Sequence, residues 1–125
     1  MGAGAELTIQ IDARNGITRI ALAGELDLAT VPILDHQLKA SERDGAIVLD
    51  LRDLGFIDSS GLHALVRAYR RSDQNGHRLV VVGAKPIVRR LCEVTGTEFL
   101  LDAEGTADVL GRFTVDESRD RGAER

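Results

Sequence analysis

The residues best suited to chemistry lie in one short segment, 53–62, which reads Asp-Leu-Gly-Phe-Ile-Asp-Ser-Ser-Gly-Leu. The hydroxyl groups of Ser59 and Ser60 directly follow the carboxylate of Asp58. A helix that begins at this point carries unsatisfied N–H groups and partial positive charge in its first turn. That environment suits a phosphate group on Ser59. The same residue types are also ordinary helix caps, so a purely structural role is the alternative interpretation.

A second acidic segment, Gly-Glu-Leu-Asp at 24–27, ends another predicted strand just before a predicted helix. In α/β proteins, functional loops lie beyond the carboxyl ends of the strands. If the two strands are neighbours in the sheet, Asp27 and Asp58 flank one surface site. The alternative for Glu25 and Asp27 is a solvated turn combined with helix capping.

Sequence patterns of self-sufficient catalytic or ligand sites are missing. The chain has no Gly-x-x-x-x-Gly-Lys-Ser/Thr loop, no Gly-x-Gly-x-x-Gly after a strand and no Gly-x-Ser-x-Gly turn. The possible metal ligands His36, His63, His77 and Cys92 are scattered without ligand spacing. We therefore expect no metal site, no bound cofactor and no enzymatic activity.

Composition narrows the class of protein further. The 125 residues suit one domain, and an apolar content of 43% is enough for a core. A net charge of −4 and an aromatic content of 3% both argue against nucleic-acid binding. A single cysteine excludes an internal disulfide. With no apolar run near the roughly 20 residues of a membrane span and no signal-peptide pattern, we expect a cytoplasmic protein without membrane association.

The elements that position these residues begin with a predicted hairpin. Residues 7–12 alternate between apolar and polar types, Asn15-Gly16 favours a tight turn, and residues 17–23 form the return strand. A helix capped by Thr30 then ends at Asp44-Gly45, and the apolar run 46–51 is typical of a buried strand. We interpret residues 53–58 as a loop between that strand and the next helix.

Helical spacing of Leu62, Leu65, Val66 and Tyr69 predicts a helix that begins near Ser60 and ends at Gly76. The following segments are predicted as a strand at 79–82, a helix at 86–95, a short strand at 99–101 and a helix at 107–113. The order β-β-α-β-α-β-α-β-α indicates one α/β domain over residues 1–113. Its mixed sheet has an N-terminal antiparallel hairpin followed by parallel βα crossovers, with helices packed against it. The charged residues 114–125 are predicted to form a disordered tail.

These segments together resemble the STAS-domain family, and more narrowly the bacterial anti-sigma factor antagonists. The resemblance is carried by Gly-Glu-Leu-Asp at 24–27, Asp-Leu at 50–51, Phe-Ile-Asp-Ser-Ser-Gly-Leu at 56–62 and Leu-Cys-Glu-Val-Thr-Gly at 91–96. It extends over residues 7–113. Either of the first and third motifs alone would be weak, but their combination in matching strand order is specific.

The resemblance implies a partner switch without catalysis by this chain. In that family an anti-sigma factor, which is an ATP-dependent serine kinase, phosphorylates the first serine of the motif, here Ser59. The unmodified antagonist binds the kinase and frees its sigma factor, the phosphorylated form does not bind, and a phosphatase resets it. The residues expected to contact the partner are Glu25, Asp27, Asp58, Ser59, Ser60, Gly61 and His63. The last of these is a departure, because the family commonly has a small residue there.

Two other functions remain open at this stage. A STAS scaffold, such as an accessory subunit of a transporter, would use the same fold without phosphoregulation. A receiver-like domain phosphorylated on Asp50 or Asp58 would also alternate strands and helices, although it would need an acidic pair after its first strand to hold Mg²⁺. Only Asp12 is found there, and a hairpin follows it. A hydrolase is a more distant alternative.

Overall fold

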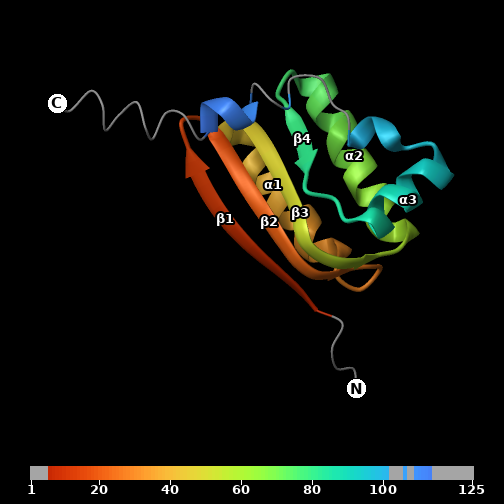
Figure 1. The fold of residues 1–125 in the computed structure, drawn as a ribbon. Coiled ribbons are helices and arrows are strands. Elements are labelled where there is room, and N and C mark those ends of the chain that lie inside the picture. Colours follow the sequence, from red (N-terminus) through yellow and green to blue (C-terminus); the bar gives the residue numbers. More distant parts are fainter. Residues whose placement is uncertain (1–5, 102–105, 107–108, 114–125) are drawn as a thin grey trace.

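The chain folds around a four-stranded mixed sheet with the strand order β1-β2-β3-β4 (Figure 1). The computed structural model describes residues 6–101, 106 and 109–113. Asn15 and Gly16 both have positive φ, at 54° and 77°, so the first two strands form the predicted antiparallel hairpin. The remaining pairs are parallel, which confirms the predicted mixed sheet. The strands are β1 (Leu7–Arg14), β2 (Ile17–Leu26), β3 (Ala46–Ile57) and β4 (Leu79–Val82).

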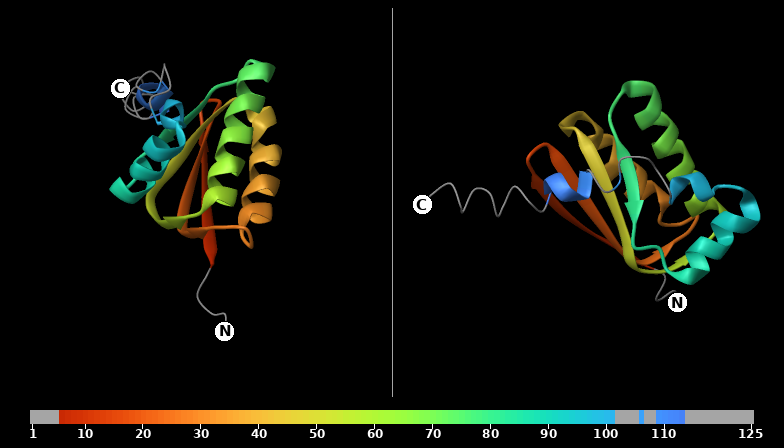
Figure 2. Two further views of the ribbon diagram at one scale, coloured as in Figure 1. Left: turned by 90° about the vertical axis from the view of Figure 1, so that its right-hand side faces the viewer. Right: turned by 45° about the horizontal axis from the view of Figure 1, so that its top comes forward.

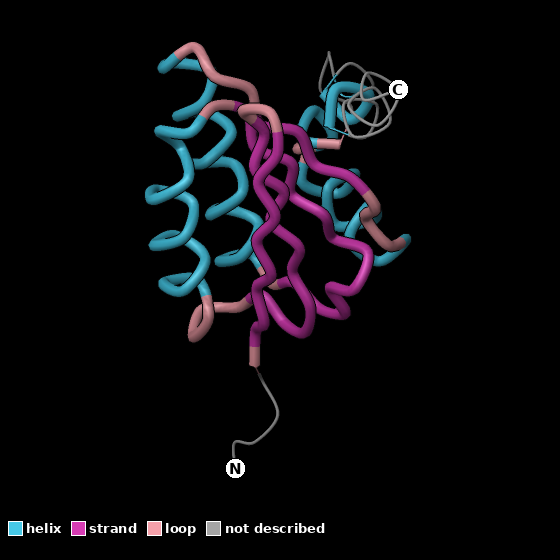
Figure 3. The backbone as a smooth tube through the Cα atoms, turned by 90° about the vertical axis from the view of Figure 1, so that its left-hand side faces the viewer, coloured by secondary structure: helices cyan, strands magenta, loops and turns pink. Residues whose placement is uncertain are grey.

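Two helices, α1 (Val31–Ser41) and α2 (Ser59–Asn75), cover one face of the sheet, and the helical residues 109–113 lie on the other face (Figures 2 and 3). Helix α3 (Pro86–Thr95) lies beyond β4 at the edge of the sheet (Figure 1). Glycines with positive φ, Gly76 and Gly96, end α2 and α3 as predicted. The tail predicted for 114–125 lies outside the described residues.

The main core fills the space between the sheet and helices α1 and α2. Leu49 of β3, Leu34 of α1 and Leu65 of α2 are all 0–1% exposed within it. A smaller cluster on the opposite face joins Val48 to Phe113 of the C-terminal helical segment. Because β2, β3 and β4 all run in the same direction, the helices that follow them begin at the same end of the sheet.

The strand predicted at 99–101 is wrong. A 3₁₀ helix, η2 (Glu98–Leu100), occupies this position. Leu100 is 1% exposed in the main core, and the Phe99 ring packs against Tyr69 of α2 with ring centroids 5.3 Å apart. A run of three apolar residues has no periodicity that separates a strand from a helical turn. Contacts with α2 therefore decide the structure of this segment.

The loop predicted at 53–58 is also wrong for most of its length. Strand β3 continues to Ile57, and only Asp58 lies between it and α2. The apolar side chains that extend the strand are Leu54 and Ile57, which are 0% and 8% exposed. They are separated from the first apolar run by Arg52 and Asp53, which disguise the continuation in the sequence.

Candidate functional site

The β2–α1 and β3–α2 junctions lie side by side at the carboxyl ends of the two inner strands. Strands β2 and β3 are parallel neighbours, and their last residues, Leu26 and Ile57, are register partners. The Asp58 N–H donates to the Leu26 carbonyl at 3.2 Å, which ties the two junctions together. The two acidic segments therefore end neighbouring strands, which was the condition for Asp27 and Asp58 to flank one surface site.

The pairing of β3 with β2 is irregular in two places before these junctions. The register between β2 and β3 shifts once between Ala21 and Ala23 and again between Gly24 and Glu25. Each shift places an extra β3 residue opposite β2, as in a β-bulge, which bends a strand and re-aims its side chains. The second shift pairs Glu25 with Phe56, directly before the site.

Asp58 connects the start of α2 with the β2–α1 turn. It occupies the N-cap position, and its Oδ1 accepts a hydrogen bond from the Gly61 N–H at 2.9 Å. Its Oδ2 accepts from the Leu28 N–H at 3.3 Å. The structural interpretation of Asp58 as a helix cap is confirmed, and the same carboxylate also holds the neighbouring turn.

Asp27 organises that turn in a similar way. Its Oδ1 accepts from the N–H groups of Ala29 and Thr30 at 3.0 and 3.1 Å. The hydroxyl of Thr30 is turned inward, where it donates to the Glu25 carbonyl and accepts from the Asp27 N–H, both at 2.9 Å. Thr30 stands at the N-cap position of α1, but its side chain makes no capping hydrogen bond. The predicted capping by the Thr30 side chain is therefore wrong, and its hydroxyl fastens the turn instead.

The two serines differ in exposure. Ser59 is the first residue of α2 and is exposed, whereas Ser60 is half-buried. His63 is exposed one turn further along the helix. The structure thus brings Ser59 together with Asp58 and, across the junction, with the turn held by Asp27.

Gly61 allows α2 to begin this close to the sheet. A Cβ atom at Gly61 would lie 2.5 Å from the Leu26 carbonyl oxygen and 2.9 Å from Cγ1 of Ile57. Real Cβ atoms essentially never approach so closely. The glycine of the Asp-Ser-Ser-Gly motif therefore packs the helix start against the ends of β2 and β3. The absence of a side chain at Gly61 is therefore a structural requirement of the helix start.

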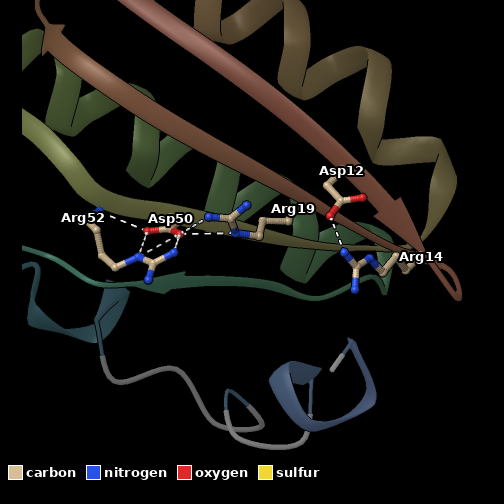
Figure 4. Close-up of polar contacts among 5 residues, drawn as sticks. All are labelled: Asp12, Arg14, Arg19, Asp50 and Arg52. Carbon is tan, nitrogen blue, oxygen red and sulfur yellow. Dashed lines mark hydrogen bonds and ion pairs between the residues drawn. The ribbon is translucent and has the colours of Figure 1, made fainter. Parts of the chain in front are cut away.

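Asp50 has a different environment, on the face opposite α1 and α2. Its side chain is nearly buried, and its Oδ2 accepts from Nη2 of Arg19 at 2.6 Å and from Nη2 of Arg52 at 2.7 Å (Figure 4). Oδ1 accepts from the Arg52 N–H at 3.0 Å and from Arg52 Nε at 3.1 Å. Burial alone would raise the pKa of Asp50, but the hydrogen bonds from Arg52 and Arg19 and the charge of Arg52 outweigh it and lower the pKa to about 2.

This ion cluster argues against the receiver-like alternative. Both oxygens of Asp50 are already engaged by guanidinium groups, so this carboxylate is not available as a phosphate acceptor. The antiparallel β1–β2 pair also differs from the all-parallel sheet order of receiver-type folds. Within the described ranges, no group of three or more His, Cys, Asp or Glu residues is arranged to hold a metal ion.

Comparison with known proteins identifies the class to which this fold and site belong. The STAS domain family matches residues 8–110. The anti-sigma-B factor antagonist of Staphylococcus aureus is 32% identical over 103 residues, which cover 80% of this chain and 95% of the relative. The anti-sigma F factor antagonist of Paenibacillus polymyxa is 34% identical over 93 residues, 72% of this chain and 80% of the relative.

Solved structures agree with this relationship. The crystal structure of an anti-sigma factor antagonist from Mycobacterium paratuberculosis has a TM-score of 0.74 at 26% identity and covers 90% of this chain and 98% of that one. The unphosphorylated form of the antagonist SpoIIAA has a TM-score of 0.69 at 20% identity, over 84% of this chain and 95% of that one, which shows the shared fold.

The chain belongs to the STAS-domain family. Within that family it is a member of the anti-sigma factor antagonists, as the sequence motifs had indicated. These antagonists are regulators and not enzymes, so the chain is a regulatory protein. Among the residues that the structure describes, no helix is long and apolar enough to cross a membrane.

Proposed function

We propose that this protein is a phosphorylation-controlled antagonist that binds an anti-sigma factor with serine kinase activity. The unmodified protein occupies the kinase and releases the sigma factor. Phosphorylation of Ser59 blocks binding, and a phosphatase that acts on phospho-Ser59 restores the active form. The exchange takes place in the cytoplasm between proteins, without direct contact with nucleic acid or membrane.

One observation carries this proposal: the exposed Ser59 stands at the start of α2 beside the Asp58 carboxylate, which accepts hydrogen bonds from the backbone N–H groups of Gly61 and Leu28. A phosphoserine adds a charge of about −1.5 to −2 at pH 7. In the free protein, the positive end of the helix dipole tolerates this charge. On a partner surface shaped for a neutral hydroxyl next to Asp58 and Asp27, the added charge is repelled and must lose its water.

The size of this effect is sufficient for a switch without refolding. Disturbing a buried polar contact in an interface costs about 2–5 kcal/mol. That range corresponds to a loss of affinity of about 30-fold to several thousand-fold. The residues that surround Ser59 in this proposed interface are Glu25, Asp27, Asp58, Ser60, Gly61 and His63.

The chemistry of phosphoryl transfer belongs to the kinase. A neutral serine hydroxyl is a weak nucleophile, so the kinase supplies the base and the Mg-ATP. The Ser59 Oγ forms a bond to the γ-phosphorus, the bond from that phosphorus to the β-phosphate oxygen breaks, and ADP leaves. The hydroxyl proton passes to the kinase base.

Mass spectrometry after incubation with the cognate kinase and ATP tests the acceptor. Wild type and Ser60→Ala are expected to gain one phosphate, and Ser59→Ala none. Modification that persists in Ser59→Ala and disappears in Ser60→Ala would show that Ser60, and not Ser59, is the acceptor. A Ser59→Asp variant is expected to lose kinase binding, and tight binding by this variant would contradict the charge mechanism. Copurification with a membrane ATPase in place of a kinase would favour a scaffold function.

A further inference from the structure

Two exposed apolar side chains lie on the two segments that form the Ser59 site, residues 24–30 and 53–61. Leu28, in the β2–α1 turn, is 75% exposed, and Phe56, near the end of β3, is 43% exposed. Single apolar side chains are common on protein surfaces and need no explanation. These two differ because both are held in place by the elements that form the Ser59 site.

Leu28 is fixed through its backbone. Its N–H donates to Asp58 Oδ2 at 3.3 Å, and the other oxygen of that carboxylate holds the Gly61 N–H at 2.9 Å. The hydrogen bonds of Asp27 and Thr30 fasten the same turn. A side chain on a fixed backbone loses less conformational freedom on docking, which favours affinity.

Phe56 is placed by the second register shift in β3. The extra residue opposite β2 makes Phe56 the register partner of Glu25. The next residue, Ile57, is 8% exposed and packs into the main core. Since successive side chains of a strand point to opposite faces, Phe56 points away from α1 and α2. Phe56 thus precedes the start of α2 along β3, and Leu28 lies in the turn that Asp58 binds across the junction.

The charges around this pair select the chemistry of a partner. Segments 24–30 and 53–61 contain four carboxylates, on Glu25, Asp27, Asp53 and Asp58, and neither Lys nor Arg. The nearest preceding cation, Arg52, binds Asp50. A second copy of this chain would bring the same acidic surface and be repelled. A protein surface with Arg or Lys around apolar pockets is complementary.

We propose that Leu28 and Phe56 are the apolar anchors of the docking surface, and that the anti-sigma factor receives them in two apolar pockets bordered by basic side chains. This assignment rests on the proposed function of the Ser59 site. The anchors set the affinity of the unmodified complex, whereas Ser59 sets whether docking occurs. In protein interfaces, a few residues that fill well-packed pockets carry most of the binding energy.

The test compares Leu28→Ser and Phe56→Ser with Val94→Ser as a matched control. Val94 is 70% exposed on α3 and lies outside both acidic segments. Binding to the cognate anti-sigma factor kinase is measured by calorimetry, and phosphorylation by steady-state kinetics. We expect each anchor variant to bind at least about tenfold more weakly, with a raised KM and an unchanged kcat, and Val94→Ser to bind as wild type. The association rate of wild type should fall as salt increases.

Thermal unfolding checks that each variant is folded, and Phe56→Leu replaces Phe56→Ser if the serine variant is not. Wild-type affinity of Leu28→Ser and of the Phe56 variant would overturn the anchors, as would equal weakening by Val94→Ser. A dimer in sedimentation that Leu28→Ser dissociates would assign the surface to a second copy and also overturn the proposal. Loss of binding by Ser59→Asp together with intact binding by the anchor variants would support the Ser59 switch and overturn the anchors. If Ser59→Asp binds as wild type, the switch itself fails, and the anchors are judged by their own affinities.

Discussion

Asp50 and Asp58 lie on and just after the same strand, yet their carboxylates have opposite surroundings. Asp50 is 3% exposed and binds the guanidinium groups of Arg19 and Arg52. Asp58 is half-buried and accepts hydrogen bonds from the backbone N–H groups of Gly61 and Leu28. The Asp50 carboxylate is paired with the cationic side chains of Arg19 and Arg52, and the Asp58 carboxylate is oriented by uncharged backbone groups.

This difference separates the part of β3 that holds the sheet from the part that presents a surface. The Asp50 cluster joins β2 to β3 through residues that are distant in the sequence. Its hydrogen bonds are satisfied within the chain, which leaves little for a partner to recognise. At the end of the strand, the carboxylates are oriented by N–H groups that carry no full charge, so their field extends into solvent. In the proposed interface, the charge of Asp58 is thus positioned by backbone groups and, among the described residues, without an ion pair.

The largest expected effect on stability comes from Asp50→Ala. Removing the carboxylate breaks its charge-assisted hydrogen bonds to Arg19 and Arg52, whose side chains remain partly solvated, so the loss should be about 2–3 kcal/mol. The exposed pair of Asp12 and Arg14, at 3.0 Å, is the matched control (Figure 4). Asp12→Ala should cost less than about 1 kcal/mol. Urea denaturation of both variants measures the difference, and equal costs would contradict the structural role of the cluster.

Acid should reveal the same cluster without mutation. The pKa of Asp50 is about 2 in the folded protein against an ordinary value of 3.8. The folded state therefore takes up this proton less readily, and the stabilisation is complete well above pH 3.8 and lost as the pH falls toward 2. The difference in pKa corresponds to about 2 kcal/mol. Urea denaturation as a function of pH should show this loss in wild type and a smaller one in Asp50→Asn; parallel curves would contradict it.

Local sequence signals were enough for much of this architecture. The strand β1, the Asn15-Gly16 turn and the glycines that end α2 and α3 all depend on neighbouring residues, and the structure confirms each of them. The alternation of β1 is only partly confirmed, because Leu7 and Ile9 are half-buried but Ile11 is 44% exposed. Asp58 as a cap is local in the same way, because it bonds the N–H three residues later.

Features that depend on distant partners could not be predicted. Arg19 and Asp50 are 31 positions apart and meet only because β2 pairs with β3. Strand β3 continues through residues first interpreted as a loop, because they pair with β2. The two register shifts in this pairing also depend on both strands. The Leu28 N–H bonds Asp58 30 positions away. The side chains of the motif were therefore predictable, but the contact that joins the two acidic segments was not.

A smaller loss of stability is expected from Gly61→Ala, which tests how closely the presenting edge is packed. The new Cβ would meet the Leu26 carbonyl oxygen at 2.5 Å, so α2 must shift. Overpacking of this kind costs about 1–3 kcal/mol. Gly55→Ala is the control, because its Cβ would meet only the Gly24 carbonyl oxygen, at 3.8 Å. Thermal unfolding should separate the two variants, and an unchanged melting temperature in Gly61→Ala would show that the helix start tolerates displacement.

Replacing Asp58 by Ala or by Asn separates its two roles. Asp58→Ala removes the cap of α2 and should cost about 1 kcal/mol. Asp58→Asn retains a good capping residue and should remain within a few tenths of a kcal/mol of wild type. Both variants lose the charge, so both should associate more slowly with the anti-sigma factor kinase and with a weaker dependence on salt. If Asp58→Asn associates as fast as wild type, the charge of this carboxylate has no part in docking.

The smallest effect is predicted for His63, whose exposed side chain follows Ser59 by one helical turn. Residues four positions apart on a helix are neighbours on its surface. We expect the imidazole of His63 to donate a hydrogen bond to the phosphoryl group being transferred to Ser59. A single exposed hydrogen bond of this kind is worth about 1 kcal/mol, so His63→Ala should lower the phosphorylation rate by no more than about fivefold. Stability should not change, because the side chain is exposed. Equal phosphorylation rates of wild type and His63→Ala would remove His63 from the switch and leave it an ordinary surface residue of α2.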